Sequence, residues 1–471
     1  MKTDVTFKLP EFEAFKQRAE RVRDVCDSRV KSKGDTYLPK PNPHDESREN
    51  QLRYDAYKMR AVFVNFTGNT RKALVGATFR KDPEAEFENG LEYVADDVDG
   101  AGNSIYQQSQ KVLAEVLTVG RHALYVDYPR SEGSKTQKQM QDEGLRATIV
   151  SIDGLSVYNW RSEYIGSKSR LSLVVFVDDQ QEYGDFAVKT ISQRRVLRLV
   201  EGVYTVEIWR KSEKAEDEWY MHDSYAPKDG KGNHWDVIPF QFVGAENNDT
   251  SIDAPPLSDM AEINIAHYRN SADYEDSVYF TGQPQAWASG IDEDFLAILK
   301  KERVYVGSRT LFPVPPGEQF GFAQTQPNQS AKEAMDSKES QMAAIGARII
   351  SKGGAVKTAT EAQNENEAEH SVLSLAVSNV SEAYVKCLAW VQRFNNSEGD
   401  YTFEINKDFT KFTVDAQLLN GFTSLINTGK WPESDFWTVM RKYQLIDADK
   451  TDEEIKGELE SSENGLGLDV E

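Results

Sequence analysis

The sequence predicts an α+β protein, because helical and strand-like periodicities occupy separate stretches of the chain. Apolar residues recur at helical spacing in residues 50–120 and 257–280, whereas residues 146–243 contain short runs that alternate as strands do. The 471 residues, of which 39% are apolar and 28% charged, are enough for large buried cores and roughly two to four structural units.

In the first helical stretch, residues 52–79 have helical spacing, and we expect Gly68 and Gly76 to break this segment into two helices. Ser104 is suited to cap the next helix, since its hydroxyl can accept a hydrogen bond from a free backbone N–H of the first turn. Gly120 is placed to end that helix, because glycine adopts the left-handed conformation at low cost.

A β-rich region follows the helix that is expected between Ser104 and Gly120. Residues 122–128 predict a buried strand, and the later runs, with turn signals such as Gly202 between them, predict an antiparallel sheet of consecutive hairpins. These later strands are expected at residues 148–150, 172–177, 195–200, 204–209, 219–220 and 237–243.

The second half of the chain combines long helices with a short insertion. A helix at 257–280 is followed by residues 283–327, whose prolines and glycines favour short strands such as 304–306. Possible capping boxes at Ser330 with Glu333 and at Thr358 with Glu361 begin two further helices, which we expect to end near residues 350 and 394. A strand at 401–405, short helices at 415–427, 433–443 and 451–460, and a disordered acidic tail complete the prediction.

The composition excludes several classes of protein. Acidic residues number 77 against 55 lysines and arginines, so a net charge of -22 should repel a free monomer from DNA and anionic lipid. Cys26 and Cys387 lie far apart, which predicts neither a disulfide framework nor a zinc site. No secretory signal or apolar run of about 20 residues is present, so we expect a cytoplasmic protein or one that leaves the cell by lysis.

The sequence predicts no catalytic, cofactor-binding or metal site. It contains no GxxxxGK[ST] motif, and its six histidines form no HExxH or His-x-His pair. The best catalytic candidate is Asp127, a carboxylate at the end of a buried strand, although an Asp before Tyr-Pro is also a natural turn former. Tryptophans of the β-region could stack on a carbohydrate, but core packing is the favoured interpretation for Trp160, Trp209, Trp219 and Trp235.

One short segment stands out as a candidate for binding phosphate. Lys352, Gly353, Gly354 and Lys357 form a flexible, basic interruption between two long helices of an acidic protein. Such a loop could touch phosphate groups, and an ordinary turn between helices is the alternative.

The order of these pieces resembles a portal protein of a tailed bacteriophage, within a group of portal-like phage proteins of uncharacterised-domain type. The resemblance lies in YKMRAVFVNFT at 57–67 with FRKDP at 79–83, VGRHALYVDYP at 119–129, VYNWR at 157–161 and APPLSDMA at 254–261. None of these strings is a catalytic signature, and their order along most of residues 50–460 is the specific feature.

The resemblance implies a portal fold with an α/β wing, a helical stem, a small β-containing clip and a helical crown. It places the parts as follows: an N-terminal wing at 1–254 (helical at 50–120, β-rich at 121–243), stem helices at 255–280 and 328–350, the clip at 281–327, a tunnel loop at 351–358, a long helix and wing strand at 359–411, and the crown with the acidic tail at 412–471.

The resemblance also implies a function without catalysis. Such proteins form a ring, usually a dodecamer, at one capsid vertex of the virion, where the ring is the head-tail connector and the channel for genome packaging, retention and ejection. The implied partners are further copies of the chain, the packaging ATPase (the large terminase subunit), the major capsid protein, a head-tail adaptor and the double-stranded DNA in the channel, with assembly in the host cytoplasm. Two alternatives stay open: a cytoplasmic α+β hydrolase that uses Asp127, and another virion structural protein.

Overall fold

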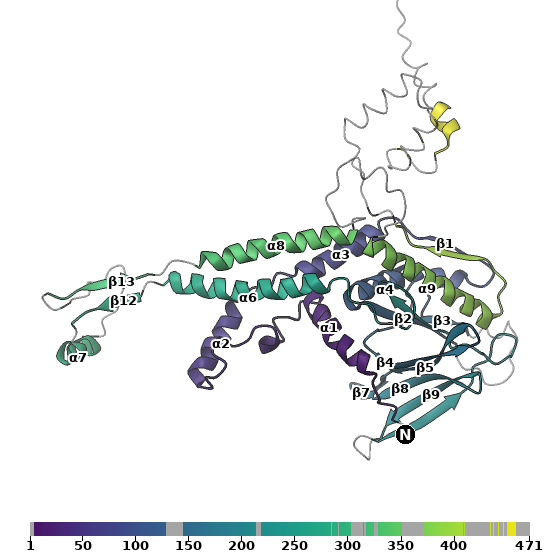
Figure 1. Cartoon of the computed structure of the whole chain (residues 1–471), viewed down its shortest axis with the longest axis horizontal. Helices are drawn as coiled ribbons and strands as arrows, with labels where there is room; N and C mark the ends of the chain where they lie inside the picture. Colours follow the sequence, from purple (N-terminus) through teal and green to yellow (C-terminus); the bar gives the residue numbers. More distant parts are fainter. Residues whose placement is uncertain are drawn as a thin grey trace, which may run out of the picture. The chain divides into compact units, whose positions relative to one another are not determined.

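The computed structural model describes most of the chain and divides it into two compact units, residues 1–407 and 408–471. The described residues are 4–128, 145–212, 218–283, 285–290, 292–302, 314, 317–324, 328–350, 371–407, 409, 434, 437, 441, 446 and 450–457. The first unit mixes helices and antiparallel sheets (Figure 1), which confirms the predicted α+β class.

Three helices begin the first unit, α1 (Pro10–Cys26), α2 (Arg48–Arg60) and α3 (Phe66–Thr78), with a short 3-10 turn η1 (Gly34–Thr36) after α1. The segment predicted at 52–79 does split into two helices, but the predicted break points are wrong, because both glycines lie inside α3. Asn65 begins α3 by accepting a hydrogen bond from the Gly68 N–H, at 2.7 Å. A Cβ on Gly68 would lie 2.4 Å from the Cys26 carbonyl oxygen, so glycine here permits close packing of α3 on α1.

The predicted helix between Ser104 and Gly120 is confirmed as α4 (Ile105–Val119). Ser104 and Gln107 form a reciprocal capping box at its start. Gly120 ends it with a φ of 83°, where a Cβ would lie 2.6 Å from the Asp253 carbonyl oxygen. The strand predicted next is confirmed as β2 (Arg121–Asp127).

The strands do not form the single meander that the sequence predicts. A three-stranded sheet has the order β11-β2-β3, and a five-stranded sheet has the order β10-β9-β8-β5-β4. The prediction fails because β11 pairs with the distant strand β2, and residue spacing does not reveal long-range partners. The remaining bounds are β3 (Thr148–Ile152), β4 (Val157–Ile165), β5 (Lys168–Val177), β8 (Gln193–Val200), β9 (Val203–Lys211), β10 (Trp219–Tyr225) and β11 (Phe240–Gly244).

The structure has further two-stranded pairs, and the sequence did not predict which strands would pair in them. The hairpin of β6 (Gln180–Tyr183) and β7 (Val188–Ile191) separates β5 from β8. The predicted strand at 401–405 is confirmed as β14 (Tyr401–Glu404), and its partner is β1 (Glu84–Phe87). A 3-10 turn, η2 (Glu92–Ala95), follows β1.

The core of this unit is layered around the three-stranded sheet. On one face, Phe242 contacts Trp160 of the five-stranded sheet, with ring centroids 5.9 Å apart. On the other face lie α4 and the helix α9 (Val372–Asn395), joined by a buried hydrogen bond of 2.9 Å from the Tyr384 hydroxyl to Gln108 Oε1. These contacts bury apolar surface on both sides of the sheet, which is the main stabilising contribution.

Two long helices, α6 (Ser258–Thr281) and α8 (Gln329–Ile350), confirm the predictions at 257–280 and 330–350. Between them lie β12 (Gln285–Ala288), α7 (Glu293–Glu302) and β13 (Phe320–Ala323), with β12 and β13 paired. The strand predicted at 304–306 lies outside the described residues.

At α8 the predicted capping box is wrong by two residues, because Asn328 Oδ1 accepts from the Ala331 N–H (3.3 Å). The capping box predicted at Thr358 and Glu361 lies outside the described residues. In the described part, the N-cap of α9 is Ser371, whose side chain accepts from the Ser374 N–H.

The second unit is described only in part. Residues 452–457 are helical, within the helix predicted at 451–460, and Arg441 forms an ion pair with Asp452. Most of the helices predicted at 415–427 and 433–443, and the whole of the tail after residue 457, lie outside the described residues.

Candidate functional site: the α6–α8 helix pair and its arm

The residues predicted to touch phosphate lie outside the described part of the chain. Lys352, Gly353, Gly354 and Lys357 all fall between the last residue of α8 and Ser371. The described elements nearest this segment include the helix pair α6–α8 and the arm, a name used for residues 278–324, which comprise the end of α6 and the elements between the two helices.

α6 and α8 run antiparallel and pack along a narrow stripe (Figure 1). α8 buries only Ala331, Met342 and Ile349. Gly346 of α8 faces Met260 of α6, since a Cβ on it would lie 3.4 Å from the Met260 methyl, an ordinary van der Waals contact. Small and apolar side chains in this stripe fix the spacing of the two helices.

Polar contacts supplement the apolar stripe between the two helices. Lys338 donates a hydrogen bond of 2.7 Å to Asn270 Oδ1. His267, which is 1% exposed, places Nε2 3.2 Å from Glu339 Oε1, and its Nδ1 has no hydrogen-bond partner among the described residues. These contacts select one register of α8 on α6, because a shifted helix would leave buried polar groups unpaired.

The first half of α6 is fixed to the body of the unit. Asn264 is fully buried, and its Oδ1 accepts from the Thr67 N–H and hydroxyl at 3.2 and 3.1 Å. Its Nδ2 donates to the Val64 carbonyl oxygen at 2.9 Å. Farther along the helix, the Tyr57 hydroxyl donates to Asp273 at 2.6 Å, and Arg60 forms an ion pair with Asp276. Helices α2 and α3 and the segment between them thus fix α6, one helix of the α6–α8 pair, to the rest of the first unit.

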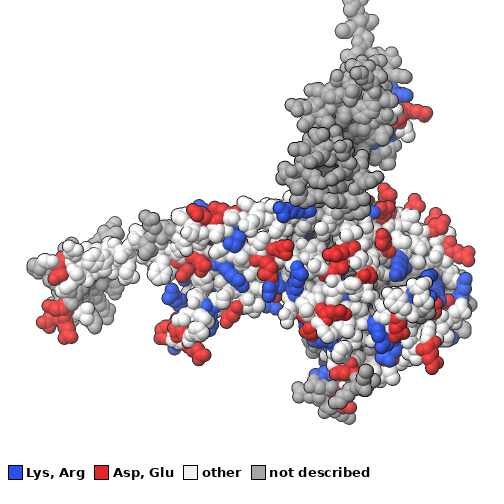
Figure 2. Space-filling view, viewed as in Figure 1, with Lys and Arg blue, Asp and Glu red and all other residues white. Residues whose placement is uncertain are grey.

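Most of the surface of α8 is exposed, and its outward residues include the small side chains Ala343, Ala344 and Ala347. The charge on the pair is slightly acidic, since α6 and α8 together contain eight acidic and four basic residues. On the face drawn in Figure 2, acidic and basic side chains alternate without a continuous basic patch. Such a surface does not favour tight binding of nucleic acid phosphates.

The arm exposes large apolar side chains that the sequence analysis did not identify. They come from the end of α6 and from the elements that follow it: Val278, Tyr279, Phe280, Trp287, Leu296 and Phe322. Phe280 is 62% exposed and Phe322 57%. Gln324 Nε2 donates to the Thr281 carbonyl oxygen at 3.0 Å, which fastens the end of β13, and so the paired strands β12 and β13, to the end of α6. Large apolar side chains that are exposed on one short segment make the arm a candidate interaction surface.

Asp127, the best catalytic candidate, has a structural role in the described contacts. Its Oδ2 accepts from Arg195 Nη1 at 2.7 Å, and its Oδ1 accepts from the Tyr128 N–H at 3.0 Å and the Tyr125 hydroxyl at 3.2 Å. Burial opposes the charge of Arg195, but the neighbouring Tyr125 and Asp127 raise its pKa above its ordinary value. This carboxylate ties β2 to the five-stranded sheet.

The tryptophans of the β-region do not form a shared stacking surface. Trp160 and Trp235 are buried, and Trp235 stacks on Phe394 at a centroid distance of 4.1 Å. Trp209 Nε1 donates to Glu207 at 2.9 Å, and the Arg194 guanidinium lies 4.7 Å from the ring centroid of Trp219. Core packing is therefore confirmed for Trp160 and Trp235.

Among the described residues, no helix is both long and apolar enough to cross a membrane. Within the same part of the chain, histidine, cysteine and acidic side chains do not gather in groups of three or more that could hold a metal ion.

Comparisons with known proteins give one family and several structures. A family described as a domain of unknown function, DUF4055, matches residues 256–395, which contain α6, the arm, α8 and α9. The chain is similar to a solved structure described as "Neck of empty GTA particle computed with C6 symmetry", with 12% identity, a TM-score of 0.39, and coverage of 82% of this chain and 92% of that chain. A second, "Neck of native GTA particle computed with C12 symmetry", has 12% identity, a TM-score of 0.37, and coverage of 81% and 91%. No curated protein matches the chain.

Proposed function

We propose that the chain is a portal protein, a structural component of a phage or phage-like virion that forms a ring-shaped DNA conduit at one capsid vertex. One observation carries the proposal: a pair of long antiparallel helices, anchored at one end to a sheet-containing body, presents a small arm with exposed apolar side chains at the other. This arrangement agrees with the wing, stem and clip that the sequence resemblance implies.

Copies of the chain would assemble through α6 and α8. α8 buries three of its 22 residues within the monomer, so most of its surface is free for contacts with neighbouring copies. Exposed alanines let helices approach closely. In a dodecamer these helix pairs would surround the channel. Their acidic balance would keep the wall from holding DNA in place, because DNA affinity rises with each phosphate that a lysine or arginine neutralises and whose counterion it releases.

The segment between α8 and α9 would touch the DNA. In this proposal Lys352 and Lys357 make transient phosphate contacts, and Gly353 and Gly354 let the loop move as the duplex passes. Screening over about 10 Å at physiological salt would confine the repulsion from the acidic wall to its immediate surface.

The remaining partners follow from the same proposal. The arm would bind the packaging ATPase (the large terminase subunit) during genome packaging and a head-tail adaptor afterwards, since its exposed aromatic side chains suit protein contacts. The body would face the major capsid protein. Assembly would take place in the host cytoplasm, and the mature ring would retain the genome until ejection.

Imaging of the purified protein tests the proposal directly. Negative-stain electron microscopy should show closed rings with a central hole wide enough for a DNA duplex, and native mass spectrometry should count about a dozen subunits. A monomer over a wide concentration range, together with normal DNA packaging by particles that lack the protein, would contradict it. Another type of virion protein would appear as an assembly without a central channel.

A variant pair then tests the loop. Lys352→Ala with Lys357→Ala should leave the ring intact and reduce the DNA content of assembled particles, whereas Lys72→Ala, on an exposed position of α3, should not. A hydrolytic activity that Asp127→Asn removes without loss of folding would favour the enzyme alternative instead.

A further inference from the structure

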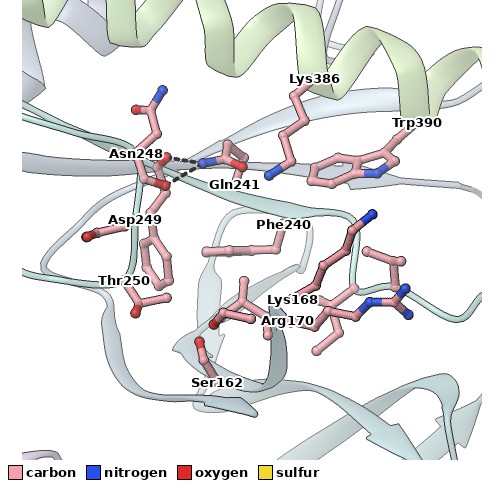
Figure 3. Close-up of a pocket in the computed structure, with 15 residues that line it drawn as sticks. Ser162, Lys168, Arg170, Phe240, Gln241, Asn248, Asp249, Thr250, Lys386 and Trp390 are labelled. Carbon is pink, nitrogen blue, oxygen red and sulfur yellow. Dashed lines mark hydrogen bonds between the residues drawn. The ribbon is translucent and has the colours of Figure 1, made fainter. Parts of the chain in front are cut away.

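A cavity of about 640 Å³ opens beside α9, away from the helix pair and the arm (Figure 3). It lies between the start of β5, strand β11, the segment 248–250 and α9. Its volume falls within the range of about 300–1,000 Å³ that is typical of small-molecule sites. No role in the proposed conduit uses this cavity.

The floor of the cavity is apolar. Ile238, Phe240 and Phe242 line it, and each is no more than 3% exposed. Phe240 and Phe242 belong to β11, which is an edge strand of the three-stranded sheet. A ligand with an apolar or aromatic body could therefore bury that body here.

Side chains already form hydrogen bonds with backbone groups along the outer edge of β11. Gln241 Nε2 donates to the carbonyl oxygens of Phe242 and Asn248, at 2.7 and 2.8 Å (Figure 3). The Gly244 N–H donates to Asn248 Oδ1 at 3.4 Å, and its carbonyl oxygen accepts from Asn379 Nδ2 at 2.9 Å. These contacts block the addition of another strand, so a small ligand suits the cavity better than an extended peptide.

Three basic side chains surround this apolar floor in a strongly acidic chain. Lys168 and Arg170 come from alternate positions of β5, and Lys386 and Trp390 come from one face of α9, four residues apart (Figure 3). The Lys386 ammonium lies 5.5 Å from the centroid of the Trp390 ring, and desolvation lowers the pKa of this lysine. The lining of the cavity thus combines three cationic side chains with an indole ring on which an aromatic ligand could stack.

Within the described residues, two of these three basic side chains have no ion-pair partner. Asp249 is the one carboxylate that lines the described cavity, and it accepts hydrogen bonds from the Ser251 N–H and hydroxyl at 2.6 and 3.3 Å. Arg170 forms an ion pair with Asp236, with 3.6 Å between Nη1 and Oδ2. Lys168 and Lys386 form no ion pair within the described part of the chain. Both lysines are exposed at the mouth of the cavity, where their charges are available to the acidic group of a ligand whose apolar body enters it.

We propose that this cavity binds a small organic anion with an aromatic body, its acidic group between Lys168, Arg170 and Lys386 and its ring against Trp390 over the Phe240 floor. The proposal stands independently of the portal function, because it uses none of the residues assigned to the channel or the arm.

Calorimetric titration of the full-length protein tests this site with adenosine monophosphate and with 1-anilinonaphthalene-8-sulfonate, two aromatic anions with different ring systems. At least one should bind, and adenosine and inorganic phosphate, each of which supplies half of the required chemistry, should bind at least tenfold more weakly than the monophosphate if that is the probe bound. Lys168→Gln with Lys386→Gln should weaken the bound probe at least tenfold, whereas Lys72→Gln with Lys332→Gln, two exposed lysines elsewhere, should change it less than twofold.

Trp390→Leu provides a second, independent variant, and it should weaken binding at least fivefold while circular dichroism shows an unchanged fold. The proposal is overturned if neither probe binds the unaltered protein, or if binding survives the double lysine change. Inorganic phosphate that binds as tightly as the aromatic probes would also overturn it, because the apolar floor would then contribute nothing.

Discussion

Helices α8 and α9 are similar in length but differ in what they bury. α9 has 24 residues, of which thirteen are buried, whereas α8 has 22 residues, of which three are buried. α9 packs on the three-stranded sheet, α4 and β14, and its buried residues follow the helical repeat over nearly its whole length. α8 contacts its own chain along one stripe. The fold of the monomer therefore explains α9, whereas α8 has exposed surface left for other molecules.

The same contrast appears within α6. Its first half is buried against α1 and α3, with Asn264 and Ile265 at 0% and 3% exposure. Its last residues, Val278, Tyr279 and Phe280, are exposed although they are apolar. Apolar side chains at the end of an otherwise anchored helix cost nothing to the monomer's packing and are available to a partner.

The largest effect is expected in α9. Leu388→Ala removes a fully buried side chain, and the transfer and cavity costs should lower the free energy of unfolding by about 2–5 kcal/mol. Chemical denaturation of the first unit measures this change. Val385→Ala, at a position of α9 that is 40% exposed, is the matched control, and we expect less than about 0.5 kcal/mol there. Equal effects at the two positions would contradict the assignment of α9 as a core helix.

A pH-dependent effect is expected at His122, a buried histidine of β2 in the first unit. Burial lowers the pKa of His122 to about 4, below its ordinary 6.5, so the unfolded chain takes up the proton first as the pH falls. Stability should thus be lost between about pH 6.5 and pH 4, amounting to about 2 kcal/mol at pH 5.

His122→Gln should remove this part of the acid sensitivity. The readout is the difference in unfolding free energy between pH 7.5 and pH 5, which should be smaller in the variant, whatever its stability at pH 7.5. His44→Gln, at an exposed position, should leave the difference unchanged. Identical pH slopes for His122→Gln and the unaltered protein would show that His122 is not held neutral by burial.

An intermediate effect is expected where α6 joins the body. Asn264→Ala removes the acceptor of the Thr67 N–H and the donor to Val64, and leaves these buried groups unpaired, which should cost about 1–3 kcal/mol. Asn270→Ala removes one part-buried bond to Lys338 and should cost about 1 kcal/mol or less. Thermal and chemical unfolding compare the two. If Asn270→Ala cost more, the α6–α8 contact would be a stronger anchor than the body.

The smallest effect on stability is expected in the arm. Phe280→Ser should change the free energy of unfolding by less than about 0.5 kcal/mol, because the side chain is 62% exposed. If the arm binds a partner, the same change should instead reduce assembly, which sedimentation velocity measures. A loss of stability above about 1.5 kcal/mol would mean that Phe280 packs within its own chain and would remove the contrast with α9.

Local sequence signals determined much of this fold. Ser104 and Gly120 delimit α4 because capping and left-handed backbone are local properties, and the spacing of apolar residues located α6 and the strand β2. The turn at Gly202 was likewise predictable, since a two-residue hairpin loop requires positive φ, which Glu201 and Gly202 both adopt.

Tertiary structure decided what depends on distant partners. The pairing of β11 with β2 and of β1 with β14 joins segments that no local pattern connects, and the glycine expected to break a helix at residue 68 instead lets α3 approach α1. Exposure follows the same rule: apolar residues at 278–280 continue the helical pattern, and they are exposed because none of the described elements covers them. The opposing lysines beside Phe240 come from β5 and α9, which folding alone brings together. Periodicity and caps are properties of neighbouring residues, whereas burial is a property of whatever the rest of the chain places on top of them.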